Sequence, residues 1–345
     1  MVGNDFRYAL RQMLKSPGFT LTAVLTLAFG IGATTAIFSI VEGVLLRPLP
    51  FPDPGRLMIV GDRLESAGDS MGSAVVTAPE VGQYARDTQG SIDLGAYQQT
   101  GYELSGVGEP SQINASRLTA GVFPVLGVSP LMGRTFTQQE DDGKAQVAVI
   151  SYQMWHSRFH GEANFLGQKI LLDRKPYEVI GVTPRDFEFP LVPGQLNRSE
   201  LWVPMSFTQG ELVQGAASWN FIMVGRLKPG VSVAQARQDV ERAAVAIQRG
   251  FPPAFSSVHI KGKIEPLEEN TVGQARPLIR TLFLAVAVVL FIACANLAGL
   301  LLVRVIRRRR EMAVRLALGA SKAVVMRQNL IEALTLSVGG GLLGL

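Results

Sequence analysis

The sequence contains few of the residues on which redox and metal chemistry depend. Its 345 residues include one cysteine, Cys294, and three histidines. A single cysteine excludes an internal disulfide, and Cys294 stands in an apolar run, where packing is the expected role. Charged residues make up only 18% of the chain, whereas hydrophobic residues make up 47%. Low charge with high apolar content indicates a membrane protein.

The sequence also lacks three common catalytic motifs. The sequence has no G-x-x-x-x-G-K-[ST] loop for ATP, no H-E-x-x-H and no G-x-S-x-G. His156 and His160 are spaced as zinc ligands on a helix can be, but the third histidine is distant in sequence. The acidic pairs Asp141–Asp142 and Glu268–Glu269 are typical of solvated loops. We therefore predict a non-enzymatic chain with no catalytic residue, no metal site and no cofactor.

The charge is distributed unevenly along the chain. Residues 47–276 contain 21 Lys and Arg against 24 Asp and Glu, and the remaining residues contain 12 basic and 4 acidic groups. The long middle region is thus mildly acidic, which argues against nucleic acid as a partner. The basic excess lies beside the apolar segments.

Three apolar segments are present, and two are long enough to cross a bilayer. Residues 18–46 and 278–303 each exceed the about 20 residues that a spanning helix needs. Residues 330–345 are too short for a full span, so we expect the chain to end inside a third membrane helix.

The basic flanks predict the orientation of these helices. Residues 1–17 are expected to form a juxtamembrane amphipathic helix at the lipid headgroups, with Arg7, Arg11 and Lys15 on one face. Residues 304–329 form a second basic segment, and both should lie in the cytoplasm. Residues 47–277 then lie outside, which in a bacterium is the periplasm. The sequence therefore predicts a multi-pass inner-membrane protein in contact with lipids.

Small residues recur at four-residue spacing in all three apolar segments. Such positions let membrane helices approach closely. The candidate packing residues are Ala28, Gly32 and Ala36, then Ala295 and Gly299, then Gly340 and Gly344.

The external region begins and ends with similar patterns. At about 55–100 and 218–266 a strand, a helix and a second strand are expected, and the helices open with the capping boxes Thr77–Glu80 and Ser232–Gln235. Two β-α-β units in one domain suggest a ferredoxin-like or porter-like module. Residues 101–208 are a β-rich insertion. The predicted fold class is membrane α-helical with an extracytoplasmic α+β domain.

The cytoplasmic stretch "RRRREMAVRLALGAS" carries more than positive charge. Glu311 precedes Arg315 by four residues, the favourable order for a helical ion pair. Gly319 can supply the left-handed residue that ends this helix, and Ser321 can cap the next. The exposed apolar residues of so short a helix require a partner surface or the membrane interface.

Several stretches resemble the permeases of MacB/FtsX-like ABC transporters, and most closely the acidobacterial duplicated orphan permeases. The stretches are "REMAVRLALGAS", "ACANLAGLLLVR", "LTLAFGIGATTAIFSIVEGVLLRPLPFPDPGRL" and, outside, "FPVLGVSPLMGRTF", "VAVISYQMWHSRFHG" and "GRLKPGVSVAQA". Family members have four membrane helices per unit, so this chain resembles an N-terminal portion.

The resemblance implies a function and partners. It implies a non-catalytic permease subunit that couples hydrolysis by a separate ATPase to motion of a periplasmic domain, for export or extraction of a substrate. The residues implied to dock on the ATPase are Glu311, Arg315, Leu316, Leu318, Gly319, Ala320 and Ser321. A second copy or a second permease half, and a periplasmic adaptor, are further implied partners.

Two alternatives remain open from the residues themselves. A two-span membrane-anchored sensor or binding protein would also carry an external domain. It would normally have a cytoplasmic output domain, however, and here the chain re-enters an apolar segment soon after Gly319. An anchored external hydrolase would need a nucleophile or metal constellation, which the sequence lacks.

Overall fold

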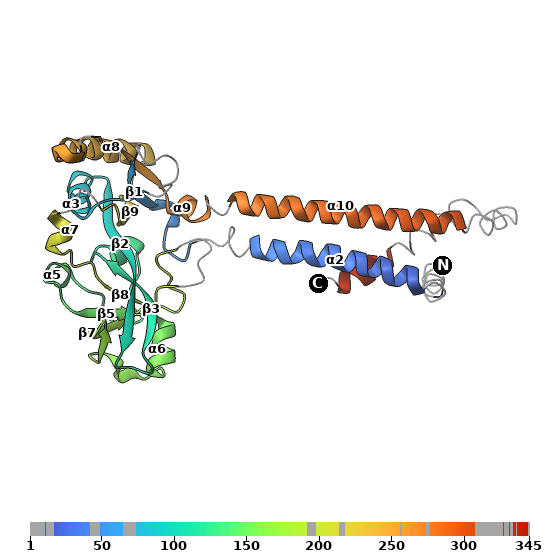
Figure 1. Ribbon diagram of the computed structural model, residues 1–345, viewed down its shortest axis with the longest axis horizontal. Coiled ribbons are helices and arrows are strands. Elements are labelled where there is room, and N and C mark those ends of the chain that lie inside the picture. The colour runs from blue at the N-terminus through green and yellow to red at the C-terminus, as the bar shows by residue number, and fades with distance from the viewer. Residues whose placement is uncertain are drawn as a thin grey trace. The chain divides into compact units, whose positions relative to one another are not determined.

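The computed structural model of the chain describes residues 11, 17–41, 49–64, 74–191, 198–213, 218–255, 257–273, 276–307, 327, 331, 334–335 and 337–343 (Figure 1). They form two compact units. One contains Met1–Arg47 and Arg276–Leu345, and the other contains Pro48–Ala275.

The first unit is built from long apolar helices. α2 (Pro17–Val41) and α10 (Arg276–Arg307) contain the stretches Pro17–Ser39 and Arg280–Leu300, each long and apolar enough to cross a membrane. The described residues between 327 and 343 are also helical. Phe29 and Phe291 are 75% and 74% exposed. A core helix of a soluble protein would bury such side chains, so the exposure fits helices that face lipid.

Threonine hydroxyls in α2 find partners within the helix itself. Thr22 and Thr34 donate to the carbonyl oxygens four residues earlier, at 2.9 and 2.7 Å. This leaves no unpaired hydroxyl at either position, as a hydrocarbon environment requires.

A ten-stranded sheet forms the framework of the second unit among the described residues. In sheet order the strands are β10 (Ile260–Pro266), β1 (Leu57–Leu64), β9 (Ile222–Leu227), β2 (Ile92–Ser105), β3 (Ser111–Leu118), β8 (Leu201–Pro204), β5 (Val147–Ile150), β7 (Lys175–Val182) and β4 (Met132–Gly133). β6 (Lys169–Leu172) pairs with β2 and β7. The helices are α3 (Ala78–Asp87), α4 (Val122–Leu126), α5 (Gln138–Asp142), α6 (Tyr152–Phe159), α7 (Gln209–Val213), α8 (Val233–Arg249) and α9 (Leu267–Gly273), with single 3-10 turns η2 (Pro54–Arg56), η4 (Ala163–Phe165) and η6 (Pro253–Phe255).

The part of the second unit formed by β1, α3, β2, β9, α8 and β10 is called the first lobe, and it has the strand order of a ferredoxin-like fold. β1, α3 and β2 form one β-α-β unit, and β9, α8 and β10 form the other. The strands lie in the order β10-β1-β9-β2, with all neighbours antiparallel. Both helices begin where the sequence predicts, since Thr77 N donates to Glu80 Oε2 at 2.6 Å and Ser232 N donates to Gln235 Oε1 at 2.9 Å. α3 and α8 pack on the same face of the sheet, over Met58 and Val60.

The elements from β3 to β8 in chain order form the second lobe, and its strands continue the same sheet from β2. The first half of β2 pairs with β9, and the second half continues through Gly101 to pair with β3. The insertion expected at 101–208 therefore begins within a strand. Its own core surrounds Phe159, Phe165 and Leu201.

The connections that lead toward the membrane helices are both anchored in this unit. Phe51 is 5% exposed and makes edge-on ring contacts with Phe187 and Phe189. Arg226 donates to the carbonyl oxygen of Pro52 at 2.9 Å. At the opposite connection Pro266 ends β10 directly across from Met58 in β1. The predicted class, apolar membrane helices with an external α+β domain, is confirmed.

Candidate functional site

The residues predicted to dock on an ATPase lie outside the described residues. These docking residues are Glu311, Arg315, Leu316, Leu318, Gly319, Ala320 and Ser321. Their role remains a prediction from the sequence.

The predicted small packing residues occupy different environments. Ala28 and Gly32 are half-buried, whereas Ala36, Ala295 and Gly299 are exposed. A Cβ added to Gly299 would meet no atom within 4 Å. Gly344 lies outside the described residues.

Gly340 and Gly30 make the close helix contacts. A Cβ on Gly340 would lie 2.5 Å from Leu27 Cβ, so only glycine allows this approach to α2. A Cβ on Gly30 would lie 3.4 Å from Ala293 Cβ, which joins α2 to α10. The sequence did not single out Gly30 or Ala293, because small residues occur on more than one face of α2 and periodicity alone does not select the face.

A buried acidic cluster lies between β1 and α3. Asp62 is 0% exposed and Glu80 is 4% exposed. The Tyr84 hydroxyl donates a hydrogen bond to Asp62 Oδ1. No donor among the described residues reaches Asp62 Oδ2 or Glu80 Oε1. Two buried carboxyls in contact can hydrogen-bond to each other only when one is protonated.

The environment of the cluster favours that proton. Burial, followed by the neighbouring Glu80 carboxyl, raises the pKa of Asp62 from 3.8 to about 8. Burial also raises the pKa of Glu80, against the hydrogen bond from Thr77 N. The pair therefore holds a proton near neutral pH. The sequence contains one signal of this buried acid, because alternation along the strand places Asp62 on the same face as Met58 and Val60. The strand alone does not identify the partners of Asp62 on α3.

Asp141 is also buried, and the expectation that the pair Asp141–Asp142 is solvated was wrong for this residue. Its side chain accepts hydrogen bonds from Ser206 N at 2.7 Å and Ala120 N at 3.2 Å. Asp141 is 5% exposed because the chain returns over it 65 residues later. Asp142 remains exposed.

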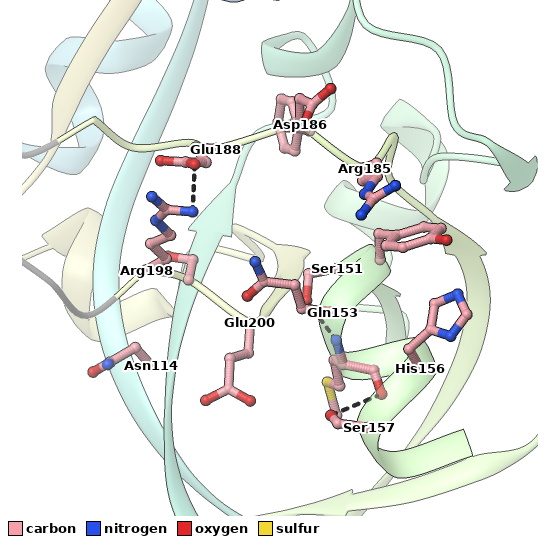
Figure 2. A pocket seen from close by; sticks show the side chains of 14 residues that line it. Asn114, Ser151, Gln153, His156, Ser157, Arg185, Asp186, Glu188, Arg198 and Glu200 are labelled. Atoms are coloured by element: carbon pink, nitrogen blue, oxygen red, sulfur yellow. Dashed lines mark hydrogen bonds and ion pairs between the residues drawn. The ribbon is translucent and has the colours of Figure 1, made fainter. Parts of the chain in front are cut away.

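A polar pocket of about 810 Å³ lies in the second lobe (Figure 2). Strands β5 and β7 are parallel and end side by side, with Ile150 opposite Val182. The segments that follow them and the residues that precede β8 converge at this edge of the sheet. The pocket is lined by Asn114, Ser151, Tyr152, Gln153, Met154, His156, Ser157, Arg185, Asp186, Phe187, Glu188, Arg198, Ser199 and Glu200.

Charged side chains stand on opposite sides of this pocket. In Figure 2, Arg185 and His156 lie on one side, and Glu188, Arg198 and Glu200 lie on the other. Glu188 and Arg198 form an ion pair at 2.5 Å. The Arg185 guanidinium lies 5.8 Å from the centre of the Tyr152 ring. Burial raises the pKa of Glu200, and the Arg158 charge lowers it by less.

The two histidines singled out in the sequence lie in different settings at the C-terminal part of α6. His156 lies in the helix and lines the pocket, whereas His160 ends α6 with a left-handed backbone, φ 53°. Across the ranges that the structure describes, no three His, Cys, Asp or Glu side chains are placed to hold a metal ion.

Comparisons with known proteins bear on both units. The family model of the MacB-like periplasmic core domain matches residues 20–243. The model of the FtsX-like permease C-terminal region matches residues 283–345.

Similar proteins and structures carry related names. The macrolide export ATP-binding/permease protein MacB of Salmonella paratyphi A is 30% identical over 233 residues, which are 68% of this chain and 34% of that protein. The Escherichia coli K12 protein of the same name is 29% identical over 232 residues, 67% of this chain and 34% of that protein. The chain thus spans about a third of the length of these relatives. The periplasmic region of MacB from Actinobacillus actinomycetemcomitans has a TM-score of 0.46 at 16% identity, covering 70% of this chain and 98% of that structure.

Proposed function

The chain belongs to the family of MacB/FtsX-like ABC transporter permeases, and we propose that it is the subunit through which a separate ATPase moves a periplasmic domain. The observation that carries the proposal is the order of parts along the chain. An apolar helix, an external domain and a second apolar helix follow one another, and the two family models match residues 20–243 and 283–345. The moving domain would drive export or extraction of a substrate.

The proposed orientation rests on charge. Basic residues flank α2 at its N-terminal end and follow α10, and such residues favour the cytoplasmic side. The N-terminus and residues 304–329 would then be cytoplasmic, and Pro48–Ala275 would be periplasmic. In this arrangement the protein is a multi-pass protein of the inner membrane.

ATP hydrolysis is assigned to a partner. The lack of a P-loop motif in the 345 residues supports this assignment. The contact would be the short helix that the sequence predicts to end at Gly319, with Leu316 and Leu318 as its apolar side chains. A second copy of this chain or a second permease half is a further proposed partner, and a periplasmic adaptor is a candidate for the outer side.

The test is copurification with the cognate ATPase and stimulation of its ATP hydrolysis by the permease in lipid nanodiscs. Leu318→Asp should abolish both, because docking would bury an unpaired charge. Leu318→Met, which keeps an apolar side chain of similar volume, should retain both and is the matched control. Gly319→Ala should weaken both, because a left-handed helix end strongly favours glycine.

Insertion into the membrane should survive these changes, since the spans are untouched. A properly inserted Leu318→Asp protein that still binds and stimulates the ATPase at the wild-type level would overturn the docking role. If no ATPase copurifies with the wild-type protein, the two-span sensor becomes the better description.

A further inference from the structure

We propose that the polar pocket of the second lobe binds a small zwitterion, an amino acid or short peptide that carries a free ammonium and a free carboxylate. The site lies wholly within Pro48–Ala275. It does not depend on coupling to an ATPase, so either proposal can fail without the other.

The position of the pocket in the fold favours a ligand site. It opens beyond the carboxyl ends of the parallel strands β5 and β7, where segments from separate parts of the chain converge. Crevices at the carboxyl ends of parallel strands are recurrent ligand sites, because loops there are free to supply side chains. A volume of about 810 Å³ lies within the range of small-molecule sites.

The side chains that line the pocket favour a small polar ligand. Twelve of the fourteen lining residues carry a polar or charged side chain, and the two others, Met154 and Phe187, are buried in the core. A large apolar ligand would leave these polar groups desolvated without partners, at a cost in free energy. The pocket is therefore suited to a small molecule that makes many hydrogen bonds.

The side of the pocket that contains Arg185 is suited to an anion. Arg185 is exposed and makes no ion pair among the described residues, and its guanidinium is held near the Tyr152 ring. Arginine in this state can bind a carboxylate through two parallel hydrogen bonds. The first turn of α6 lines the same pocket, and its N-terminal end also favours negative charge.

The side of the pocket that contains Glu200 is suited to a cation. Glu188 is already neutralised by Arg198, so Glu200 is the carboxylate available to a ligand on that side. Glu200 is half-buried, and the Arg158 charge acts on its carboxylate without an ion pair or hydrogen bond to it among the described residues. A ligand ammonium would supply the missing donors, and its charge would favour the ionised carboxylate. Figure 2 shows Arg185 and Glu200 well separated across the pocket.

Opposite charges on opposite sides select the ligand class. A phosphate or a dicarboxylate would meet Arg185, but its second negative charge would be repelled by Glu200. A simple amine would leave Arg185 unpaired. A molecule with both charges satisfies both sides at once.

The test is isothermal titration calorimetry on the full-length protein in lipid nanodiscs. The probes are alanine, Ala-Ala, Ala-Ala-Ala, N-acetyl-Ala-Ala and Ala-Ala-amide. We expect at least one of the three uncapped probes to bind, with Ala-Ala at least tenfold tighter than either of its capped forms.

Two variants assign the ends of the ligand. Arg185→Gln should remove the preference for the free carboxylate over the amide while keeping the preference for the free ammonium. Glu200→Gln should do the reverse. Arg249→Gln and Glu241→Gln, at exposed positions on α8 in the other lobe, are the matched controls and should leave all affinities unchanged.

Specific outcomes would overturn the assignment. These are no heat of binding for any probe at millimolar concentration, equal binding of capped and uncapped Ala-Ala, or equal losses in the α8 controls. Thermal unfolding of each variant, compared with the wild-type protein, separates loss of a contact from loss of the fold.

Discussion

The proton held between Asp62 and Glu80 should make the stability of the external domain depend on pH. The pKa of Asp62 is about 8 in the folded domain, against 3.8 as its ordinary value. Between these values the folded state binds one more proton than the unfolded state, so the stabilisation is complete below pH 4 and is lost as the pH rises toward 8. Its cross-strand neighbours, Gly262 and Val75, bring no charge that would offset this effect.

The magnitude follows from the proton count. One extra bound proton changes the free energy of unfolding by about 1.36 kcal/mol for each pH unit. From pH 5 to pH 7.5 the wild-type domain should therefore lose about 3 kcal/mol. For a domain of this size that corresponds to a fall in Tm of about 6–12 °C.

Asp62→Asn is the informative change. An asparagine keeps the shape, can accept the Tyr84 hydrogen bond and can donate to Glu80, but it cannot titrate. We expect its Tm to vary much less than that of the wild type between pH 5 and pH 7.5, with the variant the more stable of the two at pH 7.5. Asp93→Asn removes an exposed carboxylate of the same sheet and is the control. The assay is thermal unfolding of the soluble polypeptide 49–277, followed by circular dichroism.

The pH window separates this effect from the carboxylates whose pKa is lowered. Burial raises the pKa of Asp141 and of Glu200, but both groups are common to the wild type and the variant and cancel in the comparison. Arg134 lowers the pKa of Glu140 to about 2, and in Glu211 burial is outweighed by bonds from Arg117 and Thr208, which bring its pKa to about 2. Their contribution changes below pH 5 and with the opposite sign. The histidines are common to both proteins and cancel in the comparison. The reasoning is refuted if wild-type stability is flat or rises across the window, or if Asp62→Asn keeps the wild-type slope.

Three further predictions concern the architecture. The polypeptide 49–277 should fold without the helices and melt in one cooperative transition under reducing conditions, because it has its own core and no disulfide; an insoluble or gradually melting product would contradict this. Gly340→Ala should destabilise the full-length protein in detergent by about 1–3 kcal/mol through the clash with Leu27, whereas Gly299→Ala should be neutral; equal melting temperatures for the two would argue against the helix contact. A fluorescent reporter that is active only in the cytoplasm should stay dark when fused near Gly143, and fluorescence there would reverse the proposed orientation.

Local signals in the sequence were enough to identify much of the fold. The capping boxes at Thr77 and Ser232 predicted where α3 and α8 begin, because the hydrogen bonds join residues three apart. The strict alternation of apolar and polar residues in "VHIKGKI", residues 258–264, likewise places Ile260 and Ile264 on one strand face, and both are buried in β10. These features depend on neighbours in the chain, so the sequence alone contains them.

The candidate sites depend on contacts between distant residues and were therefore missed. Tyr84 reaches Asp62 across 22 residues, and Ser206 covers Asp141 across 65. The pocket combines residues 151–157, 185–188 and 198–200 with Asn114, and no single stretch contains both Arg185 and Glu200. Periodicity reports which face of an element is apolar, but it does not report which element lies against that face.

The pairing of Met58 with Pro266 has a mechanical consequence. The chain enters β1 and leaves β10 at the same end of one antiparallel ladder. A pull that separates the two connections therefore loads that ladder bond by bond, as in opening a zipper, rather than shearing many bonds together. Phe51 and the Arg226 bond to Pro52 would resist the first step. A movement that carries both connections together applies no tension to the ladder, so the domain should respond to the separation of its two attachment points and not to their common displacement.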